Sequence, residues 1–216
     1  MKYYHSVNNF AGINDVQLEE HDVPEDVLGY ASVSKYVCLD IETSGLDWSK
    51  DHMATCQVCV PGVYIGIVRI SDNRVANVLK KIIEDKTIQK IFHHALFDLR
   101  FFAYKWAVSP QNIVCTKVCS KILFPSEKEH SLKRLLSYFF SLEIDKSQRL
   151  SDWYGDLTSE QIQYAVNDVL YLFKLYMILC SELKKERRLY LAKSAFDFIP
   201  TRVKLDVLGC DDVFLY

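Results

Sequence analysis

Four acidic residues lie at three places in the chain where the surrounding sequence is apolar. Asp40 and Glu42 end the apolar run YVCLDIE, Asp98 lies within HHALFDLRFF, and Asp168 lies within YAVNDVLYL. Burying a carboxylate is costly unless a cation or hydrogen-bond donors compensate its charge. Carboxylates that converge also repel one another, and Mg²⁺ or Mn²⁺ would make such a cluster tolerable. Two such ions about 4 Å apart would stabilise the attacking and leaving oxygens of a displacement at phosphorus.

The local spacing of these acids is compatible with such a cluster. Asp40 and Glu42 are two residues apart on a predicted strand, so their side chains project to the same face. They also end the strand at the edge where α/β sheets place ligand sites. Tyr164 and Asp168 are four residues apart on a predicted helix and share one of its faces. Each acid alone also has a structural interpretation: solvation at a strand end, the helix dipole for Asp98, or a buried Tyr–Asp hydrogen bond.

The pattern of apolar residues predicts an α/β fold with a mixed β-sheet flanked by α-helices. Pro61 and Gly62 divide two β-rich runs, which predicts a hairpin. Thr158 and Gln161 form a predicted capping box at the start of a long helix. The expected strands cover 36–41, 54–60, 63–70 and 88–93, and the expected helices cover 75–84, 95–106, 116–124, 131–140 and 159–188.

Composition limits the kinds of substrate. The 216 residues are 50% hydrophobic and fit one domain. Lys and Arg number 26 against 28 Asp and Glu, a net charge of -2. Proteins that coat long nucleic acids usually carry a basic excess, because each neutralised phosphate adds affinity. A nucleic-acid substrate of this protein should therefore be short, or the basic groups that meet it should be local.

The cysteines and the lack of a leader pattern predict a reduced, cytoplasmic protein. No apolar run is long enough for a membrane helix, so we expect no membrane partner. Cys56 and Cys59 form a CxxC, but on a strand they point to opposite faces, and we assign them to the core. Cys115 and Cys119 share a predicted helical face and should pack as small hydrophobic residues.

The segments DIETSGL, HHALFD and YAVNDVLYL, in this order, resemble the three motifs of the DEDD superfamily of 3'-5' exonucleases. A Tyr four residues before the last Asp marks its tyrosine branch. DKSQRLSDW and LTSEQIQYAVNDVLYL resemble the ribonuclease D group, and CTKVCSK and FDFIPTRVKLDVLG resemble the nano-RNase C group. The likeness extends to nearly the full length. It implies a ribonuclease H-like exonuclease fold and hydrolysis that releases nucleoside monophosphates.

The resemblance also implies roles for particular residues. Asp40, Glu42, Asp98 and Asp168 would hold two Mg²⁺ or Mn²⁺ ions. Tyr164 would orient the attacking water or help to deprotonate it, and orientation is favoured because the ordinary pKa of a Tyr is about 10. The candidate substrate-binding residues are Thr43, Leu46, His94 and Lys146.

Alternatives stay open for several side chains. Leu46 either wedges against the bases, as in oligoribonuclease-type relatives, or packs into the core. His94 stands where related exonucleases often have Asn, and it either contacts the substrate or packs. His130 either caps the helix that begins there or meets a phosphate, whereas His93 is assigned a structural role. Arg149 is a further candidate phosphate contact.

We expect a single domain in three parts. Residues 1–30 form an N-terminal arm or edge element, 31–188 form the exonuclease domain, and 189–216 form a C-terminal packing or oligomerisation segment. We expect this protein to lack the helical domains that follow the exonuclease domain in full ribonuclease D. Members of the nano-RNase C group form ring-shaped homo-oligomers, which implies a homo-oligomer here.

The function expected from these features is that of a metal-dependent 3'-5' exoribonuclease. Its substrate would be single-stranded nucleic acid, most simply short oligoribonucleotides and dinucleotides. One alternative is ribonuclease D-like trimming of longer RNA or DNA 3' ends. A second alternative is a non-catalytic module that binds nucleic acid.

Overall fold

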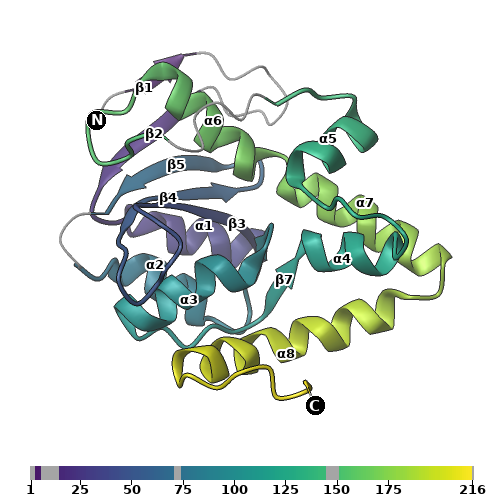
Figure 1. Cartoon of the computed structure of the whole chain (residues 1–216). Helices are drawn as coiled ribbons and strands as arrows, with labels where there is room; N and C mark the ends of the chain where they lie inside the picture. The colour runs from purple at the N-terminus through teal and green to yellow at the C-terminus, as the bar shows by residue number, and fades with distance from the viewer. Residues whose placement is uncertain (1–2, 6–14, 71–73, 145–150, 216) are drawn as a thin grey trace.

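The computed structural model describes residues 3–5, 15–70, 74–144 and 151–215. Within them, seven strands form one mixed sheet in the order β1-β2-β5-β4-β3-β6-β7 (Figure 1). The predicted α/β fold with a mixed sheet and flanking helices is therefore confirmed. The strands are β1 (Tyr3–His5), β2 (Asp15–Glu20), β3 (Tyr36–Thr43), β4 (Met53–Val60), β5 (Tyr64–Arg69), β6 (Gln89–Phe92) and β7 (Ile113–Cys115).

The strand pairings follow from the connections. The hairpin predicted at Pro61 and Gly62 joins β4 to β5 antiparallel, and Gly62 takes a positive φ of 75° in the turn. Strand β4 also pairs antiparallel with β3, whereas β3, β6 and β7 run parallel. At the other edge, β2 pairs parallel with β5 and antiparallel with β1. The part of residues 1–30 that the structure describes thus supplies an edge of the sheet.

Strand β7 corrects the sequence interpretation. Its three residues come directly before a helix, and Cys115 ends the strand instead of sharing a helical face with Cys119. Three residues are too few to show a strand period, so the helical pattern that follows dominated the prediction. Both cysteines are buried, as expected. Cys56 and Cys59 are buried in β4 and are free thiols.

The helices cover both faces of the sheet and one of its edges. Helices α1 and α2 pack together behind the sheet in Figure 1, α6 crosses in front of it, and α8 runs along the β7 side. Among the described residues, no helix combines the length and the apolar character needed to cross a membrane. The helices are α1 (Asp26–Ser34), α2 (Asn77–Glu84), α3 (Ala95–Trp106), α4 (Thr116–Leu123), α5 (Leu132–Phe140), α6 (Ser159–Leu170), α7 (Leu172–Lys185) and α8 (Leu189–Val207).

One predicted helix is two helices. The apolar period runs unbroken through 159–188, but the helix ends at Leu170 and a new one begins at Leu172. Both parts contact β3, but α6 otherwise packs on β4 and β5 whereas α7 packs on β6 and α4. The break at Tyr171 allows each part to follow its own surface. Such a break depends on tertiary contacts and leaves no Gly or Pro in the sequence to announce it.

Candidate active site

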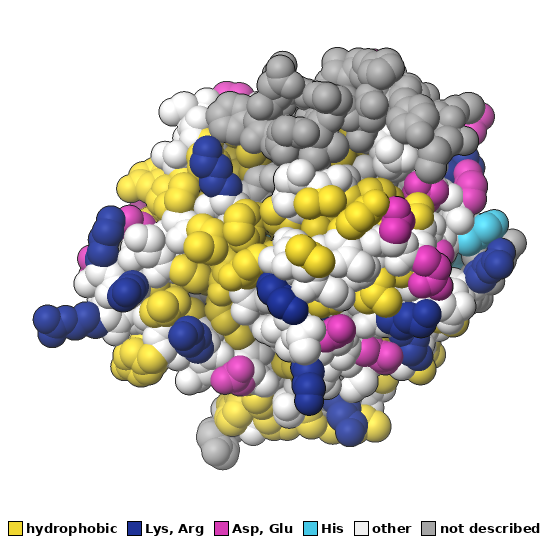
Figure 2. Space-filling model, turned by 180° about the vertical axis from the view of Figure 1, so that it is seen from behind, with side chains coloured by type: hydrophobic (Ala, Val, Ile, Leu, Met, Phe, Trp, Pro, Cys, Tyr) yellow, Lys and Arg dark blue, Asp and Glu magenta, His cyan; other side chains and the backbone are white. Residues whose placement is uncertain are grey.

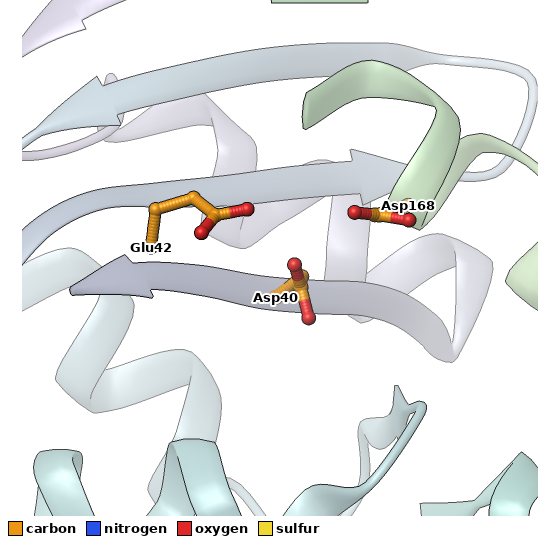
Figure 3. A group of neighbouring side chains, drawn as sticks. All are labelled: Asp40, Glu42 and Asp168. Atoms are coloured by element: carbon orange, nitrogen blue, oxygen red, sulfur yellow. The ribbon is translucent and has the colours of Figure 1, made fainter. Parts of the chain in front are cut away.

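Three acids from two elements form one cluster. Asp40 and Glu42 come from β3 and Asp168 comes from α6, and one carboxylate oxygen of each lies within 4.8 Å of the others. Figure 3 shows Asp40 and Glu42 on the same side of β3, toward Asp168 on the helix above it. The convergence expected of these three side chains is therefore present. It joins residues that are more than 120 positions apart in the chain.

Local structure fixes each part of the cluster. The β3–β4 pairing shifts register between Glu42 and Thr43, an irregularity of the kind that often lies beside active sites. The predicted capping box of α6 is confirmed: the Thr158 side chain accepts from the Gln161 backbone N–H at 3.2 Å, and the Gln161 side chain accepts from the Thr158 N–H at 2.9 Å. A fixed first turn determines where Asp168, two turns later, meets the strand.

Asp98 lies beside the cluster, on the buried side of β3. Its side chain is 2% exposed, and its Oδ1 accepts a hydrogen bond from the backbone N–H of Ile41 at 3.1 Å. Ile41 stands between Asp40 and Glu42, so Asp98 ties α3 to the strand that carries both acids. Burial, followed by the nearby charge of Asp168, raises the pKa of Asp98. Three carboxylates therefore lie close together, and the fourth, that of Asp98, contacts the backbone of the strand that carries two of them.

Tyr164 lies one helical turn before Asp168 and faces the same cluster. It is buried, and burial raises its pKa, as do the charges of Asp168, Glu42 and Asp40. Its hydroxyl interacts with the Asp168 carboxylate. The ring of Trp153 packs against that of Tyr164, with 5.8 Å between centroids. These contacts hold the phenol at the edge of the acid cluster.

The donor atoms suit a hard divalent cation. Gln57 is wholly buried on β4 directly opposite Asp40, and its Oε1 has no hydrogen-bond partner among the described residues. Its Nε2 donates to the Thr55 hydroxyl at 2.8 Å, and Thr55 lies opposite Glu42. Carboxylate and amide oxygens are the ligands that Mg²⁺ and Mn²⁺ prefer. Sequence reasoning missed this amide, although a Gln inside the apolar run TCQVCV was a visible signal.

Two of the predicted substrate-binding residues lie where β3 passes into the loop that leads to β4. The Thr43 hydroxyl donates a hydrogen bond to the backbone oxygen of Gly45 at 2.6 Å, which orders the start of this loop. Leu46 is 78% exposed. Its core interpretation is therefore wrong, and the side chain is accessible to a substrate.

His94 is the residue before α3 and has a positive φ of 76°. Side chains other than Gly adopt this region rarely, and such positions recur at functional sites. Its ring stacks near Phe97, with 6.4 Å between centroids. Partial burial, followed by the charges of Lys117 and Arg100, lowers the pKa of His94. The remaining substrate-binding candidate, Lys146, lies outside the described residues.

His93 and His130 have structural surroundings. His93 Nδ1 lies 2.9 Å from the Thr116 hydroxyl, in agreement with the structural role expected of it. His130 is buried, with Nδ1 2.8 Å from the Ser120 hydroxyl and Nε2 3.1 Å from the Glu127 backbone oxygen. The capping interpretation of His130 is wrong, because Ser131 caps α5, and both ring nitrogens of His130 already lie beside protein atoms. The second phosphate candidate, Arg149, lies outside the described residues.

Known proteins similar to this chain include DNA-processing and RNA-processing enzymes. A family model described as 3'-5' exonuclease matches residues 17–184. DNA polymerase I of Aquifex aeolicus is 31% identical over 146 residues, which are 66% of this chain and 23% of that protein. Ribonuclease D of Gluconacetobacter diazotrophicus is 32% identical over 109 residues, 50% of this chain and 28% of that protein. The chain thus spans about a quarter of these two relatives.

Similar solved structures extend over most of the chain. Brucella melitensis NrnC is 32% identical with a TM-score of 0.86, covering 93% of this chain and 98% of that one. Escherichia coli ribonuclease D shares the fold at 20% identity, with a TM-score of 0.71, 87% of this chain covered and 50% of that one. The acid cluster and the match over 17–184 lead to one assignment. This chain belongs to the 3'-5' exonuclease family and is similar to ribonuclease D and NrnC.

Proposed function

We propose that this exonuclease hydrolyses short oligoribonucleotides, down to dinucleotides, and releases nucleoside 5'-monophosphates. The observation that carries this proposal is the likeness to NrnC over 93% of the chain. One of the similar NrnC structures is described as bound to pGG. The net charge of -2 supports it, because a short substrate offers few phosphates to a basic surface. The substrate is single-stranded nucleic acid, RNA in preference to DNA.

The acids are proposed to hold two divalent cations, Mg²⁺ or Mn²⁺. Asp40, Glu42 and Asp168 supply the converging oxygens, and Asp98 completes the set from α3. An NrnC structure with bound Mg²⁺ supports this choice of ion. When bound, the cations would stabilise the charge that develops on the attacking and leaving oxygens at phosphorus.

Tyr164 is proposed to orient the attacking water through its hydroxyl, which lies against Asp168. A phenol is a good hydrogen-bonding group and a weak base at neutral pH, because its ordinary pKa is about 10. Leu46 is proposed to contact a base from the exposed β3–β4 loop. Thr43, His94 and Lys146 are proposed as further substrate contacts.

A direct assay tests the substrate. The protein is incubated with Mn²⁺ or Mg²⁺ and one of three 5'-labelled substrates: a diribonucleotide, a 20-nucleotide RNA and a duplex DNA. We expect the dinucleotide to be cleaved at least tenfold faster than the longer RNA, with nucleoside monophosphate as product. Asp40→Ala is the control for contaminating nuclease. Equal rates on all lengths would remove the short-substrate proposal and leave the exonuclease assignment in place.

A second candidate function is the trimming of longer RNA or DNA 3' ends. The ribonuclease D and DNA polymerase I relatives favour it, since both match this chain at 31% to 32% identity. The same assay separates the two functions. A ladder of products that shortens one nucleotide at a time from the 20-mer, at a rate similar to dinucleotide cleavage, would establish trimming.

We also propose that the chain has an N-terminal part, 1–30, a catalytic part, 31–188, and a C-terminal part, 189–216. The C-terminal part is proposed to contribute to a homo-oligomer. Apolar side chains gather over one half of the face that Figure 2 shows and again along its lower edge. Light scattering after gel filtration tests the assembly, and a mass of 25.1 kDa would mean a monomer. The exposed apolar side chains in this segment are Tyr190, Leu191, Leu208, Val213, Phe214 and Leu215.

The proposed compartment is the cytoplasm. All seven cysteines are free thiols in the structure, as expected of a protein that works in a reducing environment. Cell fractionation with an antibody against the protein tests this location. Recovery with the membrane or exported fraction would contradict it.

A further inference from the structure

In the segment that leads into α6, two neighbouring aromatic residues differ in exposure: the first is buried and the second is exposed to solvent. Trp153 is 3% exposed and packs against Tyr164 within the candidate active site. Tyr154, the next residue, is 48% exposed. Tyr154 is therefore an exposed aromatic residue directly bonded to one that packs within the candidate active site.

Several contacts hold Tyr154 in place. Its backbone N–H donates to Asp152 Oδ1 at 2.9 Å. The Asp152 backbone oxygen accepts from Gln161 Nε2 at 2.7 Å, which fastens this turn to the first turn of α6. At the other end of the side chain, the Tyr154 hydroxyl interacts with the side chain of Ser44. Ser44 follows Glu42 by two residues, so this interaction links the segment before α6 to the loop that follows β3.

The charges around Tyr154 indicate which part of a nucleotide it can meet. Among the residues that the structure describes, the carboxylates of Asp51 and Asp152 act on its hydroxyl. Two carboxylates disfavour a phosphate at this place, whereas an uncharged base is tolerated. An aromatic ring stacks on any base, because every base offers a π-face. The exposed Leu46 lies on the same loop as Ser44 and Asp51.

We propose that Tyr154 is a substrate-contacting residue whose ring stacks on an unpaired base next to the phosphodiester bond that is cleaved. This proposal rests on the function proposed above for the acid cluster. The backbone that carries the ring is held through Asp152 and Gln161 before the substrate arrives. Bases inside a duplex are stacked on both faces, so only an unpaired or a terminal base offers a free face to this ring.

Steady-state kinetics on a triribonucleotide test the proposal. We expect Tyr154→Ala to raise KM about fivefold or more, which corresponds to the lower end of the free energies of base–aromatic stacking. The kcat of the variant should stay within about twofold of that of wild type. Tyr154→Phe and Tyr154→Trp keep a ring and should stay within about threefold in KM. Tyr30→Ala is the matched control, because Tyr30 is also partly exposed and hydroxyl-bonded, to Asp26, but lies on α1 behind the sheet.

A binding measurement makes the test independent of turnover. A triribonucleotide that carries 2-aminopurine and a phosphorothioate linkage reports stacking as a loss of fluorescence. Wild type should quench the probe and Tyr154→Ala should not. Unchanged quenching, or a Phe variant as impaired as the Ala variant, would overturn the stacking role. A wild-type protein that quenches the probe but hydrolyses nothing would instead overturn the proposed function and leave the stacking role intact.

Discussion

At the scale of single residues, the site combines burial with like charge. Asp168 is buried, lies within 4.8 Å of two other carboxylates, and raises the pKa values of Asp98 and Tyr164. In a protein without cations this arrangement works against folding, because repulsion and desolvation both act on the charged forms. The same arrangement becomes favourable when divalent cations bind, since binding to the folded state adds stability.

Asp168→Asn should therefore have opposite effects on stability and on activity. In EDTA we expect the variant to unfold at a higher temperature than wild type, because the substitution relieves repulsion and desolvation. The free energy of unfolding should rise by roughly 1 kcal/mol. Added Mg²⁺ should raise the melting temperature of wild type and leave that of the variant nearly unchanged. Turnover should fall at least a hundredfold. Thermal unfolding with and without Mg²⁺ measures this, and a variant less stable than wild type in EDTA would contradict it.

Tyr164→Phe tests the hydroxyl and keeps the ring that packs against Trp153. We expect the Mg²⁺-dependent rise in melting temperature to persist, because the carboxylates are unchanged. Hydrolysis should slow by about a hundredfold or more, as expected when a group that acts on the attacking water is lost. Wild-type turnover in this variant would remove Tyr164 from the mechanism.

Lys90 provides a pH-dependent prediction away from the site. Burial lowers its pKa from 10.5 to about 8, while its Nζ donates to the backbone oxygens of Asp85 and Ile88. The unfolded chain then binds more protons between pH 8 and 10.5, so the contribution of Lys90 to stability rises with pH in this window.

Urea unfolding of wild type and Lys90→Met isolates this contribution from that of other groups. From pH 7.5 to 9, the free energy of unfolding of wild type should rise relative to the variant by about 1 kcal/mol. A constant difference between the two proteins would mean that the Lys90 pKa is not lowered.

At the scale of elements, the start of α6 determines where Tyr164 and Asp168 lie. The capping box satisfies the free N–H groups of the first turn, and Gln161 also donates to Ser151 Oγ and to the Asp152 backbone oxygen. The start of α6 therefore positions both the helix face that carries Tyr164 and Asp168 and the segment that carries Tyr154. Its sequence signature, Thr158 with Gln161, was readable without a structure.

Thr158→Ala should lower the free energy of unfolding by about 1 kcal/mol, the usual cost of a lost N-cap. We also expect a reduced kcat, because a frayed first turn loosens Tyr164 one turn later. Thr158→Ser keeps the accepting oxygen and serves as the control. Urea unfolding together with turnover of a dinucleotide measures both effects, and equal stability of the Ala and Ser variants would argue against the cap.

At the scale of the whole molecule, α8 is fastened to α3 through one acid. Asp206 is buried, accepts a hydrogen bond from Arg100 Nε at 2.7 Å and forms an ion pair with Arg202 Nε at 2.9 Å. Since Arg100 follows Asp98 by two residues on α3, the contact connects the C-terminal helix to the element that supports the catalytic strand.

Asp206→Ala should destabilise the protein by about 2 kcal/mol, because it leaves two partly buried guanidinium groups without their acceptor. Turnover measured well below the melting temperature should change little, since Asp206 is outside the acid cluster. Lys185→Ala is a comparison for an exposed ion pair, with Glu182, and should cost almost nothing. Similar losses of stability in Asp206→Ala and Lys185→Ala would contradict the expectation that the contacts of buried Asp206 contribute more than an exposed ion pair.

The sequence alone determined the chemistry and most of the elements. Acids within apolar surroundings, the strand spacing of Asp40 and Glu42 and the helix spacing of Tyr164 and Asp168 are local features, and local periodicity is legible in a chain. The motifs appear in the order typical of a family, which carried the exonuclease assignment. The hairpin and the capping box were predicted for the same reason.

Only the tertiary structure decided what depends on distant contacts. The break at Tyr171 follows from the surfaces on which α6 and α7 pack, and β7 is a strand because β6 pairs with it. Leu46 is exposed and His130 is buried because of what lies around them, which no spacing encodes. Gln57 joined the site through its strand partner Asp40, since cross-strand neighbours are fixed by register between segments and not by the sequence of either one.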